Sequence, residues 1–213
     1  MINPDQLIDQ LVEELEPVRG LSLTRARTLA AAIAVASAAI LIIILGMRPD
    51  FVAGAPHPLP LLCLLLTLVV AIAAIVNVTA MARPAVGAAR GGWPWSIAAL
   101  AVLPLAALVT GLANLSESST LALAIDGSAC FFIGTATAAA SIAVLALLLK
   151  RGAPSSAARA SWLIGVAGGC VGATAVAFTC PSDSIIHIGI WHAAIIPISA
   201  IVSRLAVAPL LRW

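Results

Sequence analysis

Long stretches of apolar residues without charge constrain this 213-residue chain more than any motif does. A bilayer core is about 30 Å thick, and a helix of roughly 20 apolar residues crosses it. A helix satisfies its own backbone hydrogen bonds in lipid, whereas an open sheet edge leaves them unpaired. We therefore predict an all-α, polytopic membrane protein. Its six transmembrane helices are expected at about 28–45, 59–80, 95–112, 129–149, 162–178 and 185–208.

Composition supports this class and disfavours one kind of function. Charged residues make up 9% of the chain and apolar residues 62%, whereas a soluble domain carries about a quarter charged residues. Within the predicted spans, Arg204 near the end of the last one is the deepest ionisable Asp, Glu, Lys or Arg. An ion-coupled transporter needs buried ionisable groups for its relay, so the sequence argues against a pump or an antiporter.

The basic residues predict how the chain is oriented. Every Lys and Arg except Arg48 falls before the first span, between spans two and three or four and five, or near the C-terminal end. Arg48 alone lies in the alternate set of loops. Because Lys and Arg near the ends of a span resist translocation, we expect both termini to be cytoplasmic.

The first 27 residues form a predicted cytoplasmic tail, and residues 28–213 form the bundle. An amphipathic helix is expected over 4–16, followed by a basic linker, because Asn3 suits an N-cap and Pro4 the first helical position. Its apolar stripe and acidic flank predict docking in a groove on a basic cytoplasmic protein; packing on the loops of the bundle is the alternative. The proposed contact residues are Leu7, Ile8, Leu11, Val12 and Leu15, with Asp9, Glu13 and Glu14.

Small residues recur at helical spacing in the fifth span. Gly165 and Gly169 are four apart, and so are Gly168 and Gly172. Such spacing lets two helix backbones approach closely. We expect these glycines to serve packing within one chain rather than a dimer interface.

Thiols and imidazoles gather near the predicted outer boundary. Cys130 and Cys180 lie there with Cys63, whereas Cys170 is expected to be a buried mid-span residue. Thiolates and imidazoles suit zinc, copper or cadmium, so Cys130 and Cys180 are either a functional redox or metal-linked pair or simple packing. Candidate metal ligands beside them are His57, Asp183 and His187.

A further imidazole, His192, follows His187 by five residues. It is not expected to share a helix face with His187, as residues four apart would. We expect it to form hydrogen bonds within the bundle instead.

Several short segments resemble the NrsF-like family of bacterial inner-membrane anti-sigma factors. The resemblance covers the full length and rests on LGMRPD (45–50), LLLKRGAP (147–154), TCPSDS (179–184), the Trp191–His192 pair and LLRW (210–213). It implies a protein without enzymatic activity or a resident cofactor. It also implies that the tail holds an extracytoplasmic-function sigma factor at the membrane and makes no direct contact with nucleic acid.

The same resemblance implies a signal. Members release the sigma factor under periplasmic stress, from heavy metal or oxidant, and two periplasmic cysteines are implicated in sensing. Those cysteines correspond to Cys130 and Cys180, and heavy-metal binding there would be transient. The alternative function is a membrane thiol-disulfide oxidoreductase that uses the same thiols, although the chain lacks the CxxC motif of thioredoxin-type enzymes.

Overall fold

A computed structural model describes residues 4–13, 22–82, 101–102, 104–106, 108–110, 127–152 and 154–211. Over these residues the chain is helical and has no strand, which confirms the all-α prediction for them. Five of the described helical segments are long and apolar enough to cross a membrane: α2 (Leu23–Leu45), α4 (Pro58–Ala80), α7 (Ser128–Lys150), α8 (Ala157–Ala177) and a composite segment over Ile185–Ala206. The predicted third span, 95–112, lies largely outside the described residues, so the count of six stays a prediction.

The composite last segment changes its helix type partway. It begins as α9 (Ile185–His187), continues as the π-helix η1 (Ile188–His192) and ends as α10 (Ala193–Ala206), before the short 3-10 helix η2 (Pro209–Leu211). A π-turn inside an α-helix is rare and is frequent at functional sites. Here it begins directly after His187 and ends with His192.

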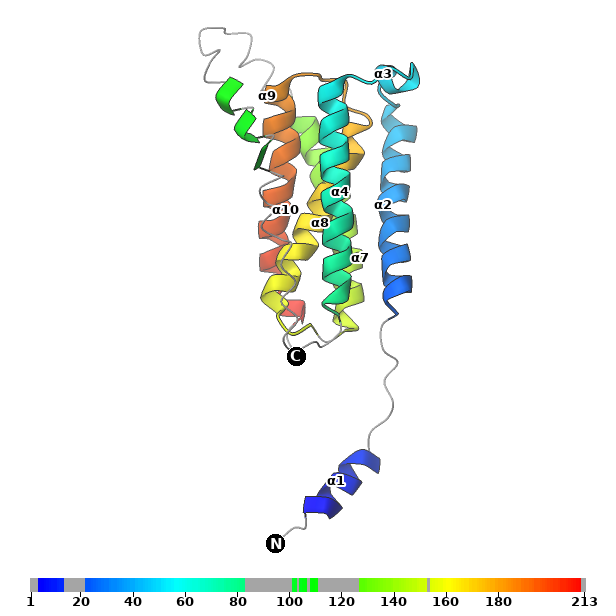
Figure 1. The fold of residues 1–213 in the computed structure, drawn as a ribbon, viewed down its shortest axis with the longest axis vertical. Helices are drawn as coiled ribbons and strands as arrows, with labels where there is room; N and C mark the ends of the chain where they lie inside the picture. The colour runs from blue at the N-terminus through cyan, green and yellow to red at the C-terminus, as the bar shows by residue number, and fades with distance from the viewer. Residues whose placement is uncertain are drawn as a thin grey trace.

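The spanning helices pack around α8 (Figure 1). Of the most apolar 18-residue stretch of α8, 83% is buried inside the protein, whereas for the corresponding stretch of α2 the share is 6%. Helix α2 buries Ala26 and Ala30, and it stands at the edge of the bundle (Figure 1). Among the residues that the structure describes, the first span therefore has few packing contacts to hold it in one position.

The four glycines of α8 explain its central place. A Cβ on Gly165 would lie 2.5 Å from Ala200 Cα, in α10. A Cβ on Gly172 would lie 2.2 Å from the carbonyl oxygen of Gly134, in α7. Glycine is required at both positions because the neighbouring backbones approach too closely for a side chain. Packing within the chain, rather than a dimer interface, is thus confirmed for these glycines.

Polar contacts across the bundle add to this packing. The Thr174 hydroxyl of α8 donates to the Thr67 hydroxyl of α4 at 2.9 Å. The Ser203 hydroxyl of α10 donates to the Ser161 carbonyl of α8 at 2.7 Å. Interhelical hydrogen bonds of this kind help to hold membrane helices together where lipid supplies no hydrophobic drive.

The two ends of the bundle differ in charge. The end of the bundle nearer α1 (Pro4–Glu13) contains the N-terminal ends of α2 and α8 and the C-terminal ends of α4, α7 and α10 (Figure 1). The described basic residues other than Arg48 belong to these helix ends: Arg25, Arg27, Lys150, Arg151, Arg159 and Arg204. Arg48 lies at the opposite end, beside α3 (Pro49–Val52). This distribution is the one on which the predicted cytoplasmic location of both termini rests.

Candidate functional site

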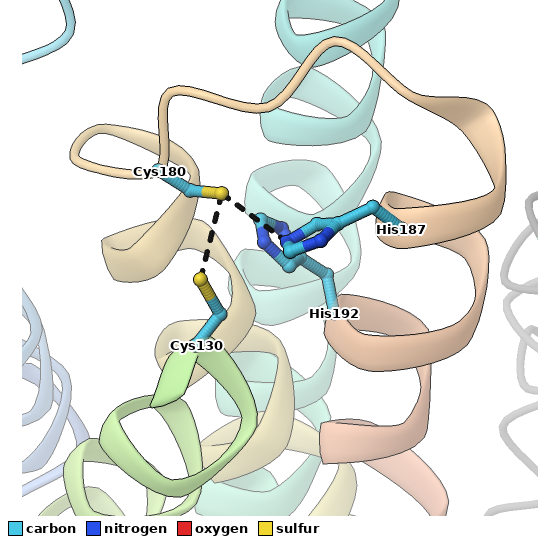
Figure 2. Close-up of side chains that lie close together, drawn as sticks. All are labelled: Cys130, Cys180, His187 and His192. Carbon is cyan, nitrogen blue, oxygen red and sulfur yellow. Dashed lines mark hydrogen bonds between the residues drawn. The ribbon is translucent and has the colours of Figure 1, made fainter. Parts of the chain in front are cut away.

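Four side chains with sulfur or nitrogen donor atoms meet at the end of the bundle where α9 begins (Figure 2). Cys130 comes from the first turn of α7, Cys180 from the loop after α8, His187 from α9 and His192 from η1. Their donor atoms all lie within 4.8 Å of one another. We call these four residues the thiol–imidazole cluster.

Two contacts within the cluster are close. The Cys130 thiol donates to Cys180 Sγ across 3.5 Å. Cys180 Sγ also lies 3.4 Å from His187 Nε2 (Figure 2). Both cysteines are free thiols. From its residues the sequence left Cys130 and Cys180 as either a functional pair or simple packing, and the structure places their sulfurs side by side.

The π-turn brings the two imidazoles together. The expectation that His187 and His192 do not share a face is wrong, because η1 has i→i+5 rather than i→i+4 spacing. Residues five apart then lie nearly above one another, and the two ring centroids are 5.5 Å apart. No α-helical pattern in the sequence could reveal this, so sequence reasoning left His192 out of the site.

Burial makes His192 unusual. Its side chain is 3% exposed, and neither ring nitrogen has a hydrogen-bond partner among the described residues. The expected hydrogen bonds within the bundle are therefore absent there. Leaving a buried polar group unpaired costs about 1–3 kcal/mol, so His192 occupies a position that packing alone does not favour.

The cluster also changes the chemistry of Cys180. The Cys130 thiol donates a hydrogen bond to it, and the His187 and His192 imidazoles lie close, so the pKa of the Cys180 thiol is held well below its usual range. The thiolate, not the thiol, is the nucleophile and the metal ligand. Cys180 is therefore prepared either to attack an oxidised sulfur or to bind a soft cation.

Arg48 connects the cluster's loop to the first span. Its side chain is 3% exposed, and Nη1 donates to the carbonyl oxygens of Cys180 and Ser182, the latter at 3.1 Å. Nη2 donates to Asp183 Oδ1 at 2.6 Å, and Nε donates to Asp50 Oδ1 at 2.8 Å. Arg48 comes three residues after α2 ends, so one side chain ties the end of α2 to the loop that carries Cys180.

The three predicted metal ligands do not form one set. His187 belongs to the thiol–imidazole cluster, whereas His57 and Asp183 lie outside that group. His57 Nδ1 is 3.8 Å from Asp183 Oδ1, and the His57 backbone N–H donates to Asp50 Oδ2 at 2.9 Å. His57 and Asp183 thus belong to the ion network around Arg48.

The remaining two cysteines are buried elsewhere. Cys170 is fully buried in the middle of α8, as expected. Cys63 of α4 is 1% exposed and packs with Ile188. Neither belongs to the group of donor atoms that defines the cluster.

The tail is helical over α1, Pro4–Glu13, and the last three residues of the predicted helix, 14–16, lie outside the described residues. Ile8 and Val12, one turn apart, are 56% and 61% exposed. Asp9 and Glu13 are exposed beside them. The structure does not describe the side chains of Leu7 and Leu11, and Glu14 and Leu15 lie outside the described residues. α1 stands apart from the bundle, at the end opposite the thiol–imidazole cluster (Figure 1).

Fold and site together define a multi-pass helical membrane protein with a thiol–imidazole cluster at one end and an exposed acidic helix beyond the other. A family model described as negative regulator of sigma F matches residues 11–213. The chain belongs to this family, which confirms the resemblance drawn from its sequence. It is therefore a negative regulator of a sigma factor, its partner is a sigma factor, and the family is one of regulators rather than enzymes.

Two other comparisons add no relative: no curated protein and no solved structure matches the chain. The family match leaves residues 1–10, and with them most of α1, outside its range. What the tail does must therefore be argued from its own residues.

Proposed function

We propose that the protein is an inner-membrane anti-sigma factor that holds an extracytoplasmic-function sigma factor through α1. A periplasmic stress signal, metal or oxidant, acts on the thiol–imidazole cluster and releases the sigma factor. The observation that carries the first half is the surface of α1. Ile8 and Val12 are exposed large apolar residues next to exposed carboxylates, a combination that favours a protein groove with basic surroundings.

The charge of α1 favours a protein partner over the membrane surface. Helices that lie on an anionic leaflet are usually rich in Lys and Arg. Residues 4–13 carry three carboxylates and no cation. A sigma factor must meet DNA and so carries basic surfaces, which an acidic helix complements during encounter.

The second half of the proposal needs a path from the cluster to the tail, and Arg48 supplies one. Its guanidinium donates hydrogen bonds to two carbonyl oxygens and one carboxylate of the 178–184 loop, so the positions of Arg48 and the loop are linked. Its backbone N–H donates to the Phe178 carbonyl at 3.0 Å. A shift of this loop therefore displaces the C-terminal end of α2. Among the described residues α2 is loosely packed, and its opposite end leads to the tail. Displacements of about 1–2 Å are typical of helix shifts in switches.

The test is a binding measurement on the full chain in lipid nanodiscs. The probe is a purified extracytoplasmic-function sigma factor from the organism that carries this chain's gene. Ile8→Asp with Val12→Asp should weaken binding by at least about a hundredfold, because hot-spot losses reach 2 kcal/mol or more per residue. The matched control is Gln6→Asp, which adds charge at an exposed position of the same helix and should change binding little. Unchanged affinity in the double variant would refute the role of α1.

A membrane thiol-disulfide oxidoreductase is the second candidate. The 3.5 Å between the Cys130 and Cys180 sulfurs favours it, since two thiols this close can form a disulfide while a quinone accepts the two electrons and two protons. Quinone-linked thiol oxidation that survives removal of residues 1–18 would support this function. Absence of turnover would leave the anti-sigma function as the better account.

A further inference from the structure

We propose that the thiol–imidazole cluster is a four-ligand site for a divalent d10 cation, Zn²⁺ or Cd²⁺, bound by two sulfurs and two imidazole nitrogens. The inference deepens the proposed function and rests on it for one point, that the cluster receives the signal. It extends the two-cysteine sensor to a site in which His187 and His192 are ligands of equal standing.

The distances already approach those of a tetrahedral site. With metal–sulfur bonds of about 2.3 Å and metal–nitrogen bonds of about 2.0 Å, ideal edges are about 3.8 Å between sulfurs, about 3.5 Å between sulfur and nitrogen and about 3.3 Å between nitrogens. The Cys130–Cys180 edge is 3.5 Å, and the Cys180–His187 edge is 3.4 Å. No pair of donor atoms is more than 4.8 Å apart, so the widest gap closes by about 1.5 Å at most.

His192 is the second, independent observation. Its imidazole is buried, offers a nitrogen within 4.8 Å of the other three donor atoms, and forms no hydrogen bond of normal geometry with a described residue. A metal ion is the partner that such a nitrogen lacks, because neutral imidazole is a common ligand of zinc. The π-turn fits the same role, since an ordinary α-helix would turn one of the two rings away.

Charge selects the cation. Two thiols lose their protons when they bind a metal, so a divalent ion with two thiolates and two neutral imidazoles makes a site without net charge. That balance matters because Cys180, His187 and His192 are buried, and a buried net charge is costly. Mg²⁺ and Ca²⁺ are disfavoured, since they prefer oxygen ligands and the cluster offers none.

Metal binding would also act on the signal path. Completing the tetrahedron changes the positions of Cys180 and the histidines relative to one another, and the Cys180 carbonyl is held by Arg48. This rearrangement therefore acts on the end of α2 that precedes Arg48. An oxidant that accepts two electrons and two protons from the two thiols would act at the same place by a different route, through a disulfide between Cys130 and Cys180.

The experiment uses the full chain, reduced, stripped with chelator and purified in detergent. Co²⁺ serves as the spectroscopic probe, and Cd²⁺ and Zn²⁺ compete with it. We expect one Co²⁺ per chain, with the absorption of a tetrahedral thiolate complex. Cys180→Ser should abolish this signal. His192→Ala should weaken Co²⁺ binding by about tenfold or more, because losing even a residue that only supports a ligand costs that much affinity. Cys170→Ser is the control, because that thiol is buried outside the cluster, and should bind like the parent.

A second measurement covers the case in which a variant does not fold. In the unaltered chain, Zn²⁺ should protect Cys130 and Cys180 from alkylation. Absence of a one-to-one complex, parental affinity in His192→Ala, or unprotected thiols would overturn the site. These metal-binding measurements do not involve the sigma factor. A negative result for metal binding would therefore leave the proposed role of α1 untouched, and a negative result for α1 would leave the metal site untouched.

Discussion

Gly172→Ala should damage the thiol–imidazole cluster from a distance. The added Cβ would lie 2.2 Å from the carbonyl oxygen of Gly134, whereas a carbon–oxygen contact needs about 3.3 Å. Backbone cannot swing aside as a side chain can, so α7 and α8 must separate by about 1 Å at this turn. Overpacking of this size costs about 1–3 kcal/mol.

The displacement reaches the site because Gly134 lies one helical turn from Cys130 on α7. The Cys130–Cys180 sulfur distance, 3.5 Å in the parent, should lengthen by a similar amount, about 1 Å. We expect disulfide formation with diamide, which takes up the two thiol hydrogens, to slow by about tenfold or more. The assay is mass spectrometry of the linked peptides over time, with thermal unfolding measured on the same samples.

Gly165→Ala is the matched control. Its Cβ would meet Ala200 Cα at 2.5 Å, so it should lower stability by a comparable amount. It presses on α10 rather than α7, and it lies two helical turns from Gly172 along α8. The Cys130–Cys180 cross-linking rate should therefore stay near that of the parent. Parental cross-linking and stability in Gly172→Ala would refute the close approach of α7 and α8 at this point.

Three further outcomes are expected. Arg48→Gln should cut signal-dependent release in a reporter assay by several-fold while Co²⁺ binding persists; equal release would exclude this path. Arg48 lowers the pKa of Asp50 to about 2, from 3.8. The carboxylate's contribution to stability is thus complete above about pH 4 and lost as pH falls through about 2. The difference in melting temperature between the parent and Asp50→Asn should follow that course, and a difference already gone at pH 5 would contradict it. Thr174→Val removes the hydrogen bond to Thr67 and should cost about 1 kcal/mol in unfolding measurements; no loss would contradict that bond.

Much of the bundle could be predicted because lipid leaves so few choices. A long uncharged apolar stretch in a membrane must be helical, so α2, α4, α7 and α8 followed from hydropathy alone. The glycines of α8 were equally informative, since residues four apart share a helix face whatever the neighbours are. Their two pairs face two different helices, and that assignment required the structure.

The site was only half predictable, for reasons of geometry. Cys130 and Cys180 could be paired by depth in the membrane and by family resemblance. His192 could not be added, because its position depends on a π-turn that the α-helical period does not describe. The contact between Arg48 and Asp183 could be guessed from charge, because Arg48 and Asp50 are the charged residues just outside the first span, but its geometry across 135 residues of sequence required the structure.

The central claim is that α1 keeps a sigma factor at the membrane. Its most direct test is the location of that sigma factor in cells that express the chain without residues 1–13, with the bundle intact and inserted. We predict that the sigma factor moves from the membrane fraction to the soluble fraction and that its target genes are transcribed without stress. A sigma factor that stays with the membrane and remains silent in those cells would contradict the account.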